Sequence, residues 1–278
     1  MFELFQEDFM CRALLGIILA SLNCAVLGTY VVLRRMAFVS TALTHTILPG
    51  VVFAMLRGFS LYWGALGAAL LTALGIGCIA NRRELREDTA IGVIFSFMFA
   101  LGVLMMSYVQ SFRDFTELLF GSALGITERD LWLIAAVSGI IFLLLALFHK
   151  ELELSSYDEE YARQCGMSPG WLRMLLLLLV ALGTVSCVRL VGALLTTALL
   201  ITPAAAAALL ARTLTGVMLL SAVIGIASGV TGLCISYYYP VPVGAAVVLV
   251  CSAFFFAAFL SKCLRERFGA RLAGPSVP

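Results

Sequence analysis

A threonine, a histidine and a proline recur at a spacing of four in the segment from residue 36 to residue 50. On a helix, Thr41, His45 and Pro49 stand at positions i, i+4 and i+8, so they share one stripe. Pro49 has no N–H to donate, so it frees the carbonyl of His45 from its helical partner. One imidazole among hydroxyls and a free carbonyl could contact a passing cation. The alternative is a histidine that only hydrogen-bonds between packed helices.

A second proline-containing segment, residues 191–204, follows the same logic. Pro203 cannot donate to the carbonyl of Leu199, and three threonines stand nearby: Thr196, Thr197 and Thr202. We therefore predict a helix break at Pro203, as at Pro49. The alternative is a kink whose free carbonyl is satisfied by a threonine hydroxyl.

A short acidic segment, residues 155–166, has the pattern of an amphipathic helix. Ser156 or Asp158 could cap its start, and Gly166 stands where a helix commonly ends. A solvated loop helix and a docking helix for another subunit are both compatible with this composition. We place the helix at about residues 156–166.

These segments are set in a chain that is too apolar for a soluble protein. Of its 278 residues, 62% are hydrophobic and 12% are charged, and the mean hydropathy is +1.07. A soluble domain carries roughly 25% charged residues. A net charge of +2 gives no basic field of the kind that binds nucleic acid. We therefore predict an all-α, polytopic transmembrane helical bundle whose outer surface contacts membrane lipid.

Nine stretches are candidates for crossing a bilayer, which takes about 20 mainly apolar residues. They are residues 10–33, 36–56, 60–80, 89–109, 131–148, 172–188, 190–211, 216–236 and 241–261. The second is the most polar, and only Arg189 separates the sixth from the seventh. The prediction is therefore eight or nine spans, in a single membrane domain over residues 1–278.

The basic residues indicate the orientation, because they are enriched on the cytoplasmic side of a membrane. If the C-terminus is cytoplasmic, thirteen of the 18 basic residues lie on that side. The remaining five are Arg12, Arg57, Arg113, Arg129 and Arg189. We predict a cytoplasmic C-terminus, with the acidic helix in the longest cytoplasmic loop. The side of the N-terminus depends on whether the spans number eight or nine.

The chain carries no means of its own to drive uphill transport. The nucleotide-binding pattern G-x-x-x-x-G-K-[ST] needs a lysine after a glycine, and neither Lys150 nor Lys262 follows one. Every Asp and Glu lies in a terminus, in a loop or near a span end, so the spans lack the buried carboxylates of an ion-coupled pump. No paired nucleophile and base appears within the spans. We expect no catalytic residue, no permanently bound cofactor and a separate energy-supplying subunit.

Eight short segments, in order, resemble the permease subunits of the manganese/zinc/iron-type ABC importers over about residues 9–262. They are residues 9–14 (FMCRAL), 31–38 (VVLRRMAF), 42–50 (ALTHTILPG), 88–92 (DTAIG), 118–121 (LLFG), 157–162 (YDEEYA), 198–205 (ALLITPAA) and 236–239 (SYYY), the last with Pro242 and Gly244. Each segment alone is weak, and their shared order makes the resemblance strong.

The resemblance implies a role for the stripe around the histidine. In this family the second helix usually carries an aspartate four residues before the histidine, and the pair lines the metal path. His45 matches the histidine, but Thr41 stands where the aspartate is expected. A threonine hydroxyl is a poorer ligand for a divalent ion than a carboxylate. Either the path is less charged here, or a second, non-identical permease supplies the carboxylate.

The resemblance also implies partners. The family's cytoplasmic coupling helix maps onto the acidic segment, which implies contact with ABC ATPase subunits for Tyr157, Asp158, Glu159, Glu160, Ala162 and Gly166. Those subunits use the ATP, and an extracytoplasmic metal-binding protein delivers manganese, zinc or iron at the bacterial cytoplasmic membrane. Import by alternating access between two permeases is then the expected function. A permease for a metal chelate or other small cargo, and a secondary transporter working alone, stay open.

Overall fold

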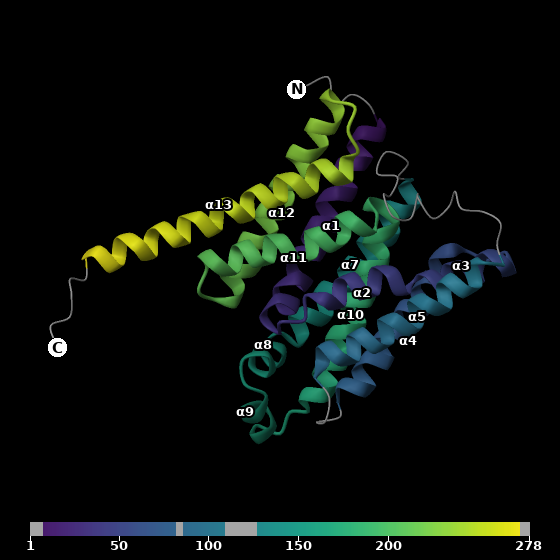
Figure 1. Ribbon diagram of the computed structural model, residues 1–278, viewed down its shortest axis with the longest axis horizontal. Helices are drawn as coiled ribbons and strands as arrows, with labels where there is room; N and C mark the ends of the chain where they lie inside the picture. The colour runs from purple at the N-terminus through teal and green to yellow at the C-terminus, as the bar shows by residue number, and fades with distance from the viewer. Residues whose placement is uncertain (1–7, 82–85, 109–126, 273–278) are drawn as a thin grey trace.

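The computed structural model describes residues 8–81, 86–108 and 127–272, and within these ranges it contains helices and turns but no strand (Figure 1). In the described part of the chain, nine helical segments are long and apolar enough to cross a membrane. They are Met10–Leu33, Ala37–Arg57, Leu61–Ala80, Glu87–Met106, Glu128–Leu147, Pro169–Val191, Ala193–Leu210, Leu214–Tyr238 and Val243–Glu266. The predicted all-α polytopic bundle is confirmed, with the higher of the two predicted span counts.

Most spans are single helices, and the second is a pair. The helices are α1 (Asp8–Leu33), α2 (Phe38–Thr46), α3 (Leu48–Arg57), α4 (Leu61–Ala80), α5 (Glu87–Met106), α7 (Glu128–Leu147), α8 (His149–Tyr157), α9 (Glu159–Gln164), α10 (Pro169–Val191), α11 (Ala193–Leu210), α12 (Leu214–Tyr238) and α13 (Val243–Leu272). The segment LLFG at residues 118–121 lies outside the described residues.

The helices form two groups around a shared core. Figure 1 shows α3, α4 and α5 together on one side and α11, α12 and α13 on the other, with α2 and α10 between them. Helix α1 packs against α10, α11 and α12, and α10 packs against α4. The side chains of Ile17, Tyr30, Leu176 and Leu195 are fully buried in this core.

Two turns depend on backbone conformations with positive φ. Gly192 has φ +83° and separates α10 from α11, so the boundary between these spans lies three residues after Arg189. Arg35 has φ +59°, and the N–H of Met36 donates to the carbonyl of Val31 at 2.9 Å. That bond closes the end of α1 and sends the chain directly into α2.

Helices α3 and α4 touch backbone to backbone at two glycines. A Cβ added to Gly50 would lie 2.0 Å from the carbonyl oxygen of Gly64, and one added to Gly64 would lie 2.2 Å from that of Gly50. Small residues allow such close approach between membrane helices. Gly64 therefore packs directly against α3, whereas the Cβ position of Gly67 meets nothing within 4 Å.

Candidate functional site

Helix α2 buries most of its surface and leaves one stripe partly uncovered. Phe38 is exposed, and Thr41 and His45 are half-buried. These positions stand three and four residues apart, so they share one face of the helix. The other residues of α2 are buried against the rest of the bundle: Val39, Ser40, Ala42, Leu43, Thr44 and Thr46. We call Phe38, Thr41 and His45 the α2 stripe.

The second span is interrupted just after the histidine. Only Ile47 separates α2 from α3; it keeps helical dihedrals (φ −69°, ψ −19°), and Pro49 stands in the first turn of α3. The N–H of Ile47 points to the carbonyl of His45. Pro49 stands four residues after His45 and has no N–H to donate to that carbonyl. At 1.5 Å per residue, His45 lies about 12 Å along a span of roughly 30 Å. The imidazole therefore lies within the membrane-spanning part of the bundle, beside a helix break.

Aromatic rings of α5 flank the imidazole of His45. The ring centroids of Phe95 and Phe99 lie 6.4 and 6.2 Å from that of His45, both in edge contacts. Phe95 also makes an edge contact with Phe38, at 5.8 Å. Helix α5 thus forms one wall beside the α2 stripe.

The α2 stripe offers only part of a metal site. Thr41 contributes a hydroxyl, and its carbonyl accepts a hydrogen bond from the Thr44 hydroxyl at 2.9 Å. Among the described residues, no group of three or more His, Cys, Asp or Glu side chains gathers to hold a metal ion. One imidazole nitrogen and one hydroxyl can contact a divalent ion, which takes more ligands than these two side chains supply.

Pro203 lies elsewhere in the bundle. Helix α11 runs from Ala193 to Leu210 through Pro203 without interruption, so the predicted break is absent there. The Cγ of Pro203 lies 3.8 Å from the Cβ position of Gly225 on α12. The hydroxyls of Thr196 and Thr197 donate to the carbonyls of Gly192 and Leu194. They therefore do not bond the carbonyl of Leu199, which Pro203 leaves without its helical donor.

The acidic segment forms two short helices where a single helix was predicted. Helix α8 ends at Tyr157, Asp158 is extended, and α9 begins at Glu159. The Asp158 carboxylate accepts hydrogen bonds from the N–H groups of Glu160 and Tyr161, both at 2.9 Å. It is therefore the N-cap, one of the two that the sequence suggested.

The other end of α9 is closed by a glycine. Gly166 has φ +81°, and the N–H of Met167 donates to the carbonyl of Ala162 at 3.1 Å. Ala162 is fully buried, while Tyr157 and Tyr161 are 61% and 53% exposed. Helix α9 therefore seats Ala162 against the bundle and presents Tyr161 and the Glu160 carboxylate outward, next to the exposed Tyr157 at the end of α8.

Removing the Asp158 cap is expected to loosen α9. Asp158→Ala takes away the acceptor for two N–H groups, which costs about 1 kcal/mol at a helix N-cap. Hydrogen exchange of the amides of residues 160 and 161 should then speed up roughly fivefold. Asp158→Asn is the matched control, because asparagine caps as well as aspartate and should leave exchange unchanged. Equal acceleration in both variants would mean that the charge, rather than the cap, holds the helix.

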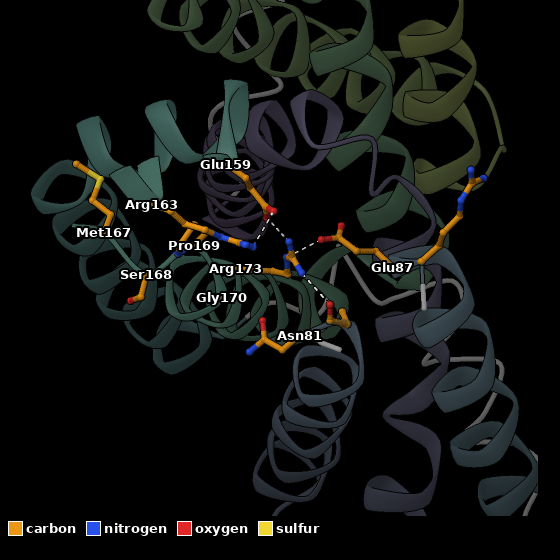
Figure 2. Close-up of a pocket in the computed structure, with 11 residues that line it drawn as sticks. Asn81, Glu87, Glu159, Arg163, Met167, Ser168, Pro169, Gly170 and Arg173 are labelled. Atoms are coloured by element: carbon orange, nitrogen blue, oxygen red, sulfur yellow. Dashed lines mark hydrogen bonds and ion pairs between the residues drawn. The ribbon is translucent and has the colours of Figure 1, made fainter. Parts of the chain in front are cut away.

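An ionic cluster beside α9 was not predicted from the sequence. Figure 2 shows the Arg173 side chain of α10 between the carboxylates of Glu87 and Glu159. Its Nε lies 2.5 Å from Glu87, an Nη pairs with Glu159, and the other Nη donates to the carbonyl of Ala80 at 2.9 Å. These groups line a cavity of about 660 Å³, together with Asn81, Arg86, Arg163, Met167, Ser168, Pro169 and Gly170.

Arg34 adds a second tie at the same end of the bundle. Its Nε donates to Ser156 at 2.9 Å and an Nη donates to Ser155 at 3.1 Å. Burial is the largest influence on the Arg34 guanidinium and lowers its pKa, whereas the carboxylate of Glu87 raises it. Arginine stays protonated in proteins, so this group still acts as a fixed cation. We call the end of the bundle that holds Arg34, Arg173 and α9 the α9 end.

Known proteins resemble this chain over nearly its whole length. A model of the family described as the ABC 3 transport family matches residues 6–262. The "Manganese transport system membrane protein MntC" of Listeria monocytogenes is 37% identical over 257 residues, 92% of each chain. The "Probable iron transport system membrane protein" of Haemophilus influenzae is 36% identical over 265 residues, 95% of this chain and 98% of that protein.

A solved structure shares the fold. The structure described as PsaBC from Streptococcus pneumoniae in complex with Fab superposes with a TM-score of 0.82 at 33% identity. The match covers 93% of each chain. The family match runs from before α1 into α13, so it includes the α2 stripe and α9.

Proposed function

The chain belongs to the ABC 3 transport family, and from this premise we propose that it is the permease of an ATP-driven importer of a divalent transition-metal ion. Manganese, iron and zinc are the candidate ions, and the first two are named in the relatives. The chain itself is a transport subunit without catalytic groups. Its place is the bacterial cytoplasmic membrane, which it crosses many times with its C-terminus in the cytoplasm.

The position of His45 carries the proposal. It is one of two histidines in the chain, and it lies inside a candidate span on a helix face that the chain itself leaves partly uncovered. Ionisable residues within a membrane are costly and usually functional. A single imidazole beside the Thr41 hydroxyl gives a weak contact, which suits an ion that must leave again.

The uncovered surface around the α2 stripe fits a second, non-identical permease. In α5, which walls the stripe, only Ala90, Ile91 and Gly102 are buried. A partner permease packed there would enclose the imidazole between two chains. It would also supply a carboxylate, which binds a divalent ion better than the hydroxyl of Thr41 does.

The α9 end is the proposed contact with the ABC ATPase subunits. Tyr157, Tyr161 and Glu160 face outward there, next to the capping Asp158. Glu159, Ala162 and Gly166 hold the helix in place. An extracytoplasmic metal-binding protein docks at the opposite end and releases its ion into the path between the permeases. ATP-driven movement of α9 then switches the path from outward-facing to inward-facing.

Reconstitution tests the proposed function directly. Liposomes containing this chain, its partner permease and the ATPase should take up manganese when ATP and the metal-loaded binding protein are supplied, and should not when ATP is withheld. Liposomes with this chain alone and an ion gradient are the control and should show no uptake. Gradient-driven uptake by the single chain would contradict the proposal and indicate a secondary transporter. Uptake of a chelate but not of the bare ion would overturn the assigned cargo.

A further inference from the structure

One guanidinium joins four helices at the α9 end. Arg173 belongs to α10 and contacts the first residue of α5 (Glu87), the first residue of α9 (Glu159) and the last carbonyl of α4 (Ala80). Figure 2 shows it in the middle of these groups. The Arg173 side chain is 13% exposed, against 27% for Glu87 and 39% for Glu159. The guanidinium is therefore largely shielded from water, whereas the Glu159 carboxylate of α9 is partly exposed.

Helix α5 depends on this contact more than its neighbours do. It buries three side-chain positions inside the chain, Ala90, Ile91 and Gly102, while α10 buries fifteen. Packing contributes to stability in proportion to the apolar area that it removes from water. Helix α5 packs against α2, α3 and α4 but buries few of its residues there, so the ion pair of Glu87 at its described N-terminal end contributes to its position.

The same face of α5 leads from the ion pair to the histidine. Glu87, Ile91, Phe95 and Phe99 stand four residues apart and therefore form one stripe along the helix. Ile91 is fully buried, and Phe95 and Phe99 contact the imidazole of His45. At 1.5 Å per residue, those two rings lie about 12 and 18 Å from Glu87 along the helix axis. A shift of Glu87 therefore moves the wall beside His45.

We propose that Arg173 is a positioning residue that transmits movement of α9 to α5 and so to the aromatic wall beside His45. The inference rests on the proposed function, because it takes α9 as the element that the ATPase moves. When α9 moves, the Glu159 carboxylate moves relative to the Arg173 guanidinium. The guanidinium then shifts with it, and its ion pair with Glu87 moves as well. Helix α5 then follows because its first residue is tied to the guanidinium and few of its residues are buried within this chain.

The chemistry of arginine suits this role. Its planar guanidinium presents donors in several fixed directions, so it can contact two carboxylates and a carbonyl at once. A lysine has one compact ammonium and cannot keep all three contacts in the same geometry. Arg173→Lys should therefore keep the charge and lose the transmission.

The test measures metal uptake and ATP hydrolysis in the same liposomes, using the complete complex with manganese-loaded binding protein. We expect Arg173→Lys, Glu87→Gln and Glu159→Gln to lower the manganese imported per ATP hydrolysed about tenfold, within the usual range of coupling between sites. ATP hydrolysis should continue. The double variant E87Q/E159Q should be no worse than either single one, because both act through the same guanidinium.

The matched control is another arginine–glutamate pair between helices. Arg12 of α1 lies 3.7 Å from Glu128 of α7, at the end of the bundle opposite α9. Arg12→Gln should leave the manganese imported per ATP unchanged. The two glutamine variants are isosteric with glutamate, so they keep the test decisive if the Arg173 variant fails to insert.

Three outcomes would overturn the inference. A wild-type ratio in the Glu87 and Glu159 variants would show that no transmission passes through Arg173. A proportional fall of uptake, hydrolysis and inserted protein would show that the cluster only stabilises the fold. A wild-type complex that imports no manganese with ATP would overturn the proposed function itself, and the inference with it.

Discussion

Replacing His45 with alanine is expected to abolish metal uptake while the amount of membrane-inserted protein stays at the wild-type level. The imidazole is the one nitrogen ligand on the α2 stripe, and a hydroxyl alone binds a divalent transition-metal ion poorly. Disturbing the surroundings of a metal ligand already costs 10- to 100-fold. Loss of the ligand itself should lower uptake by at least about 100-fold. Radioactive manganese uptake into reconstituted liposomes measures this directly.

The insertion of the His45 variant should be normal because the ring is half-buried and makes edge contacts rather than filling the core. Thr41→Ser keeps a hydroxyl on the same stripe and serves as the control that retains uptake. Unchanged uptake in His45→Ala would reject the α2 stripe as part of the path. Equal losses in both variants would point to the fold of α2 instead of the imidazole.

Reversing the charges of Asp158, Glu159 and Glu160 to lysine is expected to remove the stimulation of ATP hydrolysis by the metal-loaded binding protein. The change removes the cap of α9, places a cation against Arg173 and inverts the outward charge at residue 160. A coupling energy between sites is typically worth 5- to 150-fold, so a loss of stimulation of about tenfold or more should be measurable. Hydrolysis by the purified complex, with and without binding protein, is the readout.

Single variants separate the three contributions. Glu160→Lys changes only an outward-facing side chain, so it isolates the contact with the ATPase. Glu151→Lys on α8 lies outside the capped turn and is the control that should keep the stimulation. Normal stimulation in the triple variant would remove the coupling role from this segment.

The membrane fold followed from composition because each span is a mainly apolar stretch of about the length that crosses a bilayer. The predicted ends agree with the structure within a few residues, since a change of solvent at the bilayer surface sets them. The predicted boundary between α10 and α11 lay at Arg189, because a charged residue usually marks the end of a span. The chain turns at Gly192, whose positive φ only a structure reveals.

The sequence predicted a helix break at both Pro49 and Pro203, and the two prolines differ in the structure for a physical reason. Pro49 stands in the first turn of α3, where its missing N–H needs no helical partner, so a new helix begins there after Ile47. Pro203 lies in mid-helix, and the packed neighbours α1 and α12 hold α11 in one piece around it. The sequence cannot distinguish these cases, because it does not show which neighbours hold a helix in place.

The Arg173 cluster could not be predicted because its members are far apart in the sequence and individually ordinary. Glu87 and Arg173 each stand at a span end, where a charge needs no partner. Their pairing depends on how α4, α5, α9 and α10 converge. The one sequence signal was a charged residue four positions after Pro169, just inside an apolar run.

The backbone contact between Gly50 and Gly64 has a mechanical consequence. With no side chain between them, α3 and α4 can neither slide nor roll past each other without a clash of main-chain atoms. The two helices therefore form one unit, which Ile47, a residue with helical dihedrals (φ −69°, ψ −19°), joins to α2. Any rearrangement that displaces α3 next to His45 must therefore displace α4 with it.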